Sequence, residues 1–137
     1  MRNGGSEIDQ HNRARVRLAA LVGEHRRAQA ARRGAIAIED RRALTRADTR
    51  LAAVTRAIEA AGCPQLARLL VDETRGGAAL LVALTTDDGT DDELDRVLCT
   101  YRQARQQVDG LSAGAGLELP VNAGVPEQGQ LQPQSTL

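Results

Sequence analysis

Aromatic residues and lysine are nearly absent from this chain of 137 residues. It has no Trp, no Phe and no Lys, and Tyr101 is its one aromatic residue. Nucleic-acid readers of the OB or RRM kind stack single-stranded bases on aromatic side chains, so that class of protein is disfavoured. β-Branched residues are also scarce, whereas the strong helix formers Ala and Leu number 23 and 17. The composition therefore predicts a mainly α fold with a thin core, because Ala buries little area.

Cysteine and long apolar runs are rare as well. Cys63 and Cys99 have no second Cys or His at a metal-ligand spacing, which disfavours a metal site or a redox pair. The longest apolar run, residues 78–84, has seven residues, whereas a membrane-spanning helix needs roughly 20. The N-terminal segment lacks the apolar region of a signal peptide. We therefore expect a soluble, cytoplasmic protein with no membrane partner.

Charge of one sign is concentrated in each half of the chain. All 18 basic residues are Arg, and the formal net charge is zero. Residues 1–60 carry 13 Arg against 7 acidic residues, and residues 61–137 carry 5 Arg against 11 acidic residues. Such asymmetry indicates either an acidic partner for the first half, such as nucleic acid, or attraction between the halves within or between chains. The neutral total favours attraction between the halves.

Two segments place mostly apolar residues at alternating spacings of three and four. This is the heptad pattern of a helix packed lengthwise on another, as in a coiled coil. The first seam consists of His11, Ala14, Leu18, Leu21, His25 and Ala28. The second seam consists of Leu44, Ala47, Leu51, Val54, Ile58 and Ala61. Each seam predicts one helix with an apolar face.

The two seams are out of phase across Gly34. If the first seam continued past Ala28, its next positions would be mostly polar and would miss the second seam. Gly is the usual residue just after a helix, and Gly34 follows two Arg that suit the negative end of a helix. We therefore predict an antiparallel helical hairpin with helices at about 7–33 and 38–61. The alternative is a single helix bent at Gly34.

The segment after this hairpin has two interpretations. Gly62 is expected to end the second helix, and Pro64 suits the first position of the next. Leucines then share a helical face, but Gly76 and Gly77 interrupt the segment, which predicts one or two short helices. The alternative is an α+β fold with a β-hairpin at about 68–85, turning at the Gly-Gly pair.

A clear helix start follows at Thr90, an expected N-cap residue with acidic residues in the next turn. An apolar stripe predicts a longer helix at 91–109, with Gly110 as its stop. Beyond it the sequence is rich in Gly, Pro and Gln. We therefore divide the chain into a helical domain, 1–111, and a flexible or extended tail, 112–137, which could order as an arm against a partner.

We considered two metal sites and rejected both. The acidic loop lacks the alternate ligand spacing of a calcium loop and is explained by helix capping. His11 and His25 lie fourteen residues apart in the sequence, which is roughly 21 Å along a helix and too far to share one ion. The chain also has no defensible catalytic grouping and no phosphate-cradling glycine loop. We assign no catalytic, cofactor or metal residues and expect no small-molecule substrate.

These observations favour a non-enzymatic helical assembly or adaptor protein. It would self-associate as a homo-oligomer or dock on a larger protein complex, as a host accessory factor or a phage structural or packaging component does. The expected oligomerisation residues come from both seams and are Leu18, Leu21, Leu44, Leu51, Val54 and Ile58.

The alternative is a duplex nucleic-acid-binding accessory protein, such as a DNA-binding factor. Its Arg-rich hairpin would contact phosphates without aromatic stacking. The residues expected to make these contacts are Arg13, Arg17, Arg42, Arg46 and Arg50. A solvated helix face would show the same pattern, since several Arg have acidic neighbours three or four residues away, such as Glu24 for Arg27 and Asp109 for Arg105.

Overall fold

The structure is a computed structural model that describes residues 3–86 and 88–119. Within these residues it is all-helical and contains no strand, which confirms the mainly α prediction. Its elements are α1 (Asn3–Ala37), α2 (Arg41–Ala60), α3 (Pro64–Thr85) and α4 (Asp91–Gly114). Residues 120–137 of the expected tail lie outside the described residues. No helix in the described part of the chain is long and apolar enough to cross a membrane.

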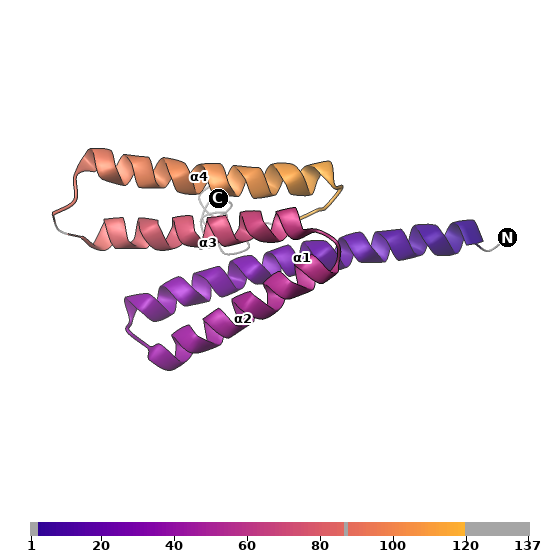
Figure 1. The fold of residues 1–137 in the computed structure, drawn as a ribbon, viewed down its shortest axis with the longest axis horizontal. Helices are drawn as coiled ribbons and strands as arrows, with labels where there is room; N and C mark the ends of the chain where they lie inside the picture. The colour runs from indigo at the N-terminus through magenta and orange to yellow at the C-terminus, as the bar shows by residue number, and fades with distance from the viewer. Residues whose placement is uncertain (1–2, 87, 120–137) are drawn as a thin grey trace, which may run out of the picture.

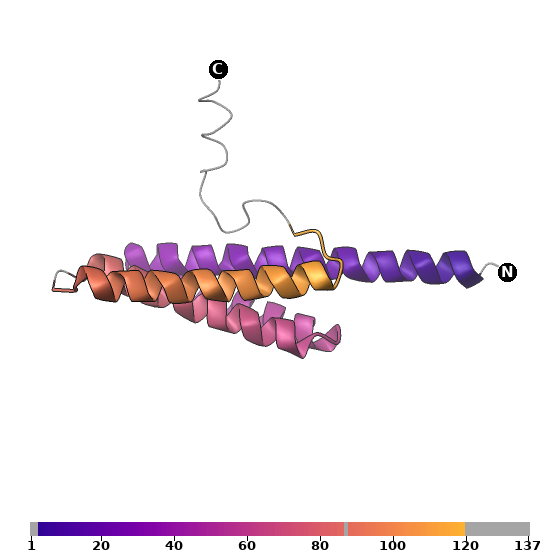
Figure 2. The same cartoon turned by 90° about the horizontal axis from the view of Figure 1, so that it is seen from above.

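The helices form two antiparallel hairpins that pack on each other (Figure 1). The most extensive contacts lie within the hairpins, between α1 and α2 and between α3 and α4. The N-terminal part of α1 extends well beyond the other helices, as both Figure 1 and Figure 2 show. The structure is therefore a four-helix bundle with one helix projecting from one end.

The chain reverses between α1 and α2, so the hairpin is correct, but the glycine assigned to the turn is not its turning point. Gly34 lies inside α1, which continues to Ala37. The reversal uses Glu39, whose φ of 56° is left-handed. The hydrogen bonds from the Asp40 N–H to the Ala35 carbonyl (2.9 Å) and from Glu39 to Ile36 (3.1 Å) close the helix in a Schellman motif.

The two seams pack within this single chain. From Leu18 onward the first seam faces the bundle, while His11 and Ala14 precede the bundle and are exposed. In the second seam the central positions are buried and the ends are less covered. The main apolar cluster draws on all four helices and the segment after α4, and its members include Leu18, Val22, Val54, Ile58, Leu66, Leu70, Val108 and Leu117.

The helix α3 is continuous, so the helical interpretation of this segment is correct, whereas an interruption at the glycine pair and the β-hairpin alternative are wrong. The start is as expected, because Gly62 has a left-handed φ of 91° and Pro64 is the first helical residue. Gly76 and Gly77 are helical and buried, and neither a break between short helices nor a β-hairpin at 68–85 forms. Tertiary packing therefore overrides the helix-breaking tendency of these glycines.

The glycine pair lets α4 approach α3 closely. A Cβ atom on Gly76 would lie 3.2 Å from the Cα of Tyr101 on α4 and 3.3 Å from its ring. A Cβ on Gly77 would lie 3.3 Å from the same ring and 3.0 Å from the Arg33 guanidinium. The absent side chains thus make room for the single aromatic residue of the chain.

The helix α4 begins as predicted and ends later than predicted. Thr90 caps it, since the Thr90 hydroxyl accepts a hydrogen bond from the Glu93 N–H at 3.1 Å. Gly110 does not stop the helix at 109, because the last turn runs on to Gly114. The left-handed residue that follows is Gly116, with φ 78°, and it directs Leu117 into the core.

Candidate functional site

A buried ionic cluster joins the two hairpins. Arg26 of α1 and Glu73 of α3 are 4% and 0% exposed, although neither belongs to an apolar pattern in the sequence. The Arg26 guanidinium donates to both Glu73 oxygens, from Nε at 2.9 Å and from Nη2 at 2.7 Å. The same Nη2 donates to Asp109 Oδ1 of α4 at 2.9 Å. One guanidinium therefore ties three helices together with charge-assisted hydrogen bonds.

The charge state of Arg26 is well defined. Burial alone lowers the pKa of Arg26, but hydrogen bonds and charges from Glu73 and Asp109 outweigh that effect and raise the pKa above its ordinary value. Arg26 is therefore a permanent cation in the core. Such a group is stable in the interior because its partners are present, and removing one of them leaves a buried charge uncompensated.

A second group of hydrogen-bonded side chains lies beside the Arg26 cluster and connects α1 to α2. The Thr55 hydroxyl donates to the Leu51 carbonyl at 2.7 Å, so it accepts from His25 Nε2 at 3.2 Å. Nδ1 of the same ring then accepts from the Gln29 amide at 2.9 Å. The directions of these three hydrogen bonds are consistent with one another. They require a neutral His25 ring with its proton on Nε2.

Burial holds His25 in that neutral form. It lowers the pKa of the ring from an ordinary 6.5 to about 4, with the Glu73 carboxylate opposing the shift and Arg26 adding to it. The ring is 1% exposed. His25 therefore acts as a structural hydrogen-bond link, and protonating it would place two donors opposite each other at Gln29.

A groove of about 530 Å³ runs over this group between α2 and α3. Its lining is mainly apolar, with contributions from Leu51 and Val71, and His25 and Thr55 contribute polar atoms. Arginines also line it, although Arg32 is paired with Asp48 at 2.7 Å. The lining resembles a packing surface, and the polar atoms of His25 and Thr55 within it are engaged in the bundle's own hydrogen bonds.

The residues expected to mediate oligomerisation lie inside the chain's own bundle. Four are at most 9% exposed and belong to the packed faces of α1 and α2, namely Leu18, Leu51, Val54 and Ile58. Leu21 and Leu44 are half-buried. The two seams thus pack on each other and on their neighbours within one copy of the chain.

The five arginines expected to bind phosphate do not form one surface. All are exposed. Arg17 lies beside the C-terminal end of α2, where it lines a hollow with Ala57 and Ala61. Arg42 and Arg46 lie near the other end of that helix, and about 16 Å of helix separates residue 46 from residue 57. The sequence pattern therefore describes two separate groups of arginines.

The ion pairs that form are mostly long-range ones. Arg50 donates to Glu24 at 2.6 Å, and Arg32 pairs with Asp48 in the same hairpin. The acidic residues predicted to pair with nearby arginines pair with distant ones instead. Glu24 pairs with Arg50 and not Arg27, and Asp109 pairs with Arg26 and not Arg105. Arg105 lies over the Tyr101 ring, 5.8 Å from its centroid.

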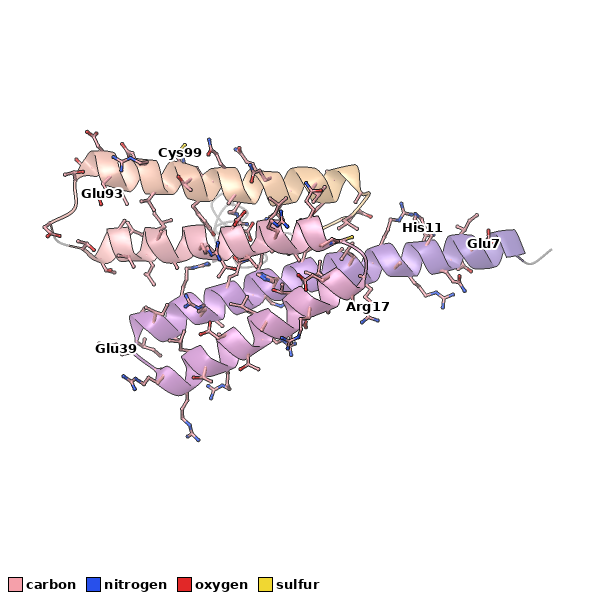
Figure 3. All side chains as sticks on the ribbon, in the orientation of Figure 1. Glu7, His11, Arg17, Glu39, Glu93 and Cys99 are labelled. Atoms are coloured by element: carbon pink, nitrogen blue, oxygen red, sulfur yellow. The ribbon has the colours of Figure 1, made fainter. Side chains whose placement is uncertain are left out.

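The residues weighed as metal ligands stay apart. Figure 3 shows His11 on the projecting part of α1, away from the bundle, whereas His25 is buried in it. In residues 3–86 and 88–119 no group of three or more His, Cys, Asp or Glu side chains could hold a metal ion. Asp87 of the acidic loop lies outside the described residues. Cys63 and Cys99 are both free thiols, half-buried and exposed respectively.

Sequence reasoning missed three buried polar residues, namely Arg26, Glu73 and Gln29. One signal was available, because Gln29 lies one helical turn after His25 of the first seam, and Arg26 lies one turn before Gln29. Glu73 gave no comparable signal, since its partner is 47 residues away in the sequence.

Comparisons of the chain with protein-family models, with curated proteins and with solved structures give no match.

Proposed function

We propose that this chain is a non-enzymatic helical assembly protein, which self-associates or docks on a larger complex through the projecting part of α1. The observation that carries this proposal is the exposure of α1 before Leu18. Residues 7–14, 16 and 17 are exposed, with Arg15 half-buried, and no other helix of the described chain runs beside most of this segment (Figure 1).

The uncovered part of α1 gains little stability from the bundle. It extends a helix that is already formed and so needs no nucleation, but each added residue contributes little free energy in water. This segment also carries two large exposed apolar side chains, Ile8 at 62% and Val16 at 70%. A second protein surface that covers these side chains would stabilise the helix and remove apolar area from water. The segment is therefore suited to contact another molecule.

The test is the mass of the full chain in solution. We expect sedimentation velocity to show a species larger than a monomer whose population rises with concentration. Val16→Asp should weaken that association, because it places a charge in the apolar contact. Ile38→Asp is the matched control, since Ile38 is equally exposed at 72% but lies at the α1–α2 turn. A strictly monomeric wild type with no partner-dependent shift would refute the proposal.

A second function, contact with duplex nucleic acid, has one observation in its favour. Arg42 and Arg46 are exposed near the start of α2, one turn apart. Their charge is available to phosphates. Arg50, the third member of that row, is engaged with Glu24 and is a weaker candidate.

Duplex retention at low salt separates this function from assembly. If phosphate contacts exist, the binding constant falls steeply as salt rises, and Arg42→Glu with Arg46→Glu weakens binding on all sequences alike. Arg68→Glu with Arg102→Glu is the control, because it makes the same change in net charge at exposed sites on α3 and α4. No retention of the wild type would remove this function.

A further inference from the structure

Large apolar side chains are exposed at two opposite ends of the molecule. Among the described residues the exposed large hydrophobics are Ile8, Val16, Ile38, Val82 and Leu84. The first two lie on the projecting part of α1. Val82 and Leu84 lie at the far end of α3, next to the turn into α4, and Figures 1 and 2 place this turn at the opposite end from the N-terminus.

The first of these ends is the projecting helix, and we call its residues 7–17 the α1 rod. Its start carries Glu7 and Asp9, whereas the part next to the bundle carries Arg13, Arg15 and Arg17 and is basic. Its exposed Val16 lies within one helical turn of Arg13 and Arg17, both exposed. The Arg17 label in Figure 3 marks this side chain where α1 leaves the bundle. The rod thus presents an apolar side chain between positive charges.

The second end is an acid-edged notch. A hollow of about 310 Å³ lies between the end of α3 and the start of α4, and we call it the tip notch. Its apolar lining includes Val82, Leu94 and Val97. Asp88 and Glu93 also line it, and both are exposed. The tip notch thus offers an apolar contact beside negative charges, which complements the α1 rod.

The charge of the two hairpins repeats this complementarity on a larger scale. Residues 3–60, which form the first hairpin, carry 12 Arg against 7 acidic residues. Residues 64–119 carry 5 Arg against 10 acidic residues. Two copies arranged with the rod end of one at the tip end of the next bring opposite charges together, whereas rod-to-rod contact brings like charges together.

We propose that this protein self-associates head to tail, with the α1 rod of one copy docked in the tip notch of a second copy. Val16 packs against Val82 and Leu94. Arg13 and Arg17 approach the acidic side chains Asp88 and Glu93. The inference rests on the proposed function, because it specifies which surfaces of the assembling chain meet. Such a contact joins two different surfaces, so repeating it produces a ring or an open filament.

The docked area is small, and this determines how strongly the copies are expected to associate. A stable interface buries about 800 Å² on each partner, which is more than a short helix docked in a shallow notch provides. Assembly is therefore weak and concentration-dependent. It is also sensitive to ionic strength, because the Debye length is about 10 Å at 0.1 M salt and about 3 Å at 1 M salt.

The experiment uses two charge-reversed forms of the full chain. The rod variant is Arg13→Glu with Arg17→Glu, and the notch variant is Asp88→Arg with Glu93→Arg. Each places like charges on both surfaces of the contact, so each alone should raise the association Kd by more than about tenfold. Mixing the two variants in equal amounts pairs an acidic rod with a basic notch and a basic rod with an acidic notch. We expect the mixture to recover assembly.

The controls separate this contact from general charge effects. Arg68→Glu with Arg102→Glu matches the rod variant in net charge and should assemble like the wild type. Asp88→Arg alone tests the notch without altering α4, because Asp88 precedes its cap residue Thr90. Circular dichroism confirms that each variant keeps its helical content. Sedimentation velocity at low and high salt measures the assembly.

Each outcome decides the question. Loss of assembly in both variants with recovery on mixing supports head-to-tail docking. If the wild type assembles and the variants match the control, or if mixing restores nothing, the head-to-tail inference is wrong while the proposed assembly function stands. A wild type that is monomeric at every concentration, with no partner, refutes both.

Discussion

The two hairpins of this molecule reach the same antiparallel geometry by different means. In the α1–α2 hairpin, two apolar seams face each other and ion pairs such as Arg50–Glu24 bridge the helices. In the α3–α4 hairpin, Gly76 and Gly77 remove side chains so that Tyr101 can lie against the α3 backbone. The first hairpin depends on interdigitating side chains, and the second depends on close approach of two helices.

The difference teaches which contacts can be inferred from local sequence. The seam residues can be recognised in the sequence by their spacing, because a helix must turn one apolar face to its partner. The glycine pair has the opposite appearance, since Gly interrupts a helix unless a neighbour requires its missing side chain. The cluster of Arg26, Glu73 and Asp109 then joins the two hairpins.

Breaking that cluster should have the largest effect on stability. Glu73→Ala leaves the Arg26 guanidinium buried without its bidentate partner. We expect the free energy of unfolding, measured by urea denaturation, to fall by about 3–5 kcal/mol. Asp72→Ala is the control, because its side chain is 48% exposed and pairs weakly with Arg75; it should change stability by less than about 1 kcal/mol.

A double variant distinguishes lost charge pairing from lost packing. Replacing both partners, Arg26→Met with Glu73→Leu, removes the uncompensated charge and retains side-chain volume. We expect it to be more stable than Glu73→Ala. If the double variant is as unstable as the single one, the cluster's contribution does not come from its charges.

Acid should weaken the bundle through His25. Its pKa in the folded state is about 4 and its ordinary value is 6.5, so the unfolded chain binds the proton first as pH falls. This contribution to stability is complete above pH 6.5 and is lost progressively between pH 6.5 and 4, to a total of about 3 kcal/mol. Urea denaturation at a series of pH values measures the slope.

Comparison of variants assigns the slope to this ring. In His25→Gln the part of the slope above pH 5 should shrink, because no buried imidazole remains to be protonated. His11→Gln is the matched control, because it removes an imidazole from the exposed α1 rod and leaves the buried one in place. An unchanged slope in His25→Gln would show that other groups control the acid sensitivity.

Much of the fold was predictable from the sequence, but the points at which helices end or continue were not. The hairpin, the Thr90 cap and the Pro64 start follow from local rules and are present. The errors concern glycines, because Gly34, Gly76 and Gly110 all lie inside helices. A glycine stops a helix only where the chain needs a left-handed residue, and that need is set by the path of the chain through the whole molecule.

The candidate site was less predictable than the fold. Leu18 and Val54 were correctly selected as apolar contact positions, but the prediction assigned them to contacts between copies. A heptad seam specifies that a helix has a partner and does not specify whether the partner belongs to the same chain. The exposed apolar residues Val16 and Val82 gave no signal in the sequence, because exposure emerges only when the ends of the helices are placed.

A smaller loss is expected when the close approach within the second hairpin is disturbed. Gly76→Ala would bring a Cβ atom within 3.2 Å of the Tyr101 backbone, which cannot move as a flexible side chain can. We expect a loss of about 1–3 kcal/mol in chemical denaturation. Gly110→Ala, within α4 and with nothing within 4 Å of its Cβ, should instead stabilise the protein by about 0.5–1 kcal/mol. Equal effects of both changes would contradict this account of the glycine pair.

The smallest effect concerns the turn of the first hairpin. Glu39 adopts a left-handed φ of 56°, a conformation that costs a residue with a Cβ about 1–2 kcal/mol. Glu39→Gly removes this cost in the folded state. The glycine also makes the unfolded chain more flexible, which favours unfolding by about 0.5–1 kcal/mol, so the net stabilisation should be less than about 1 kcal/mol. Gly34→Ala should also stabilise, because its Cβ would meet nothing within 4 Å. Thermal denaturation of both variants measures the gain. Combining the two changes would move the glycine from position 34 to position 39, where the chain reverses. A loss of stability in Glu39→Gly alone would mean that the Glu39 side chain itself stabilises the turn.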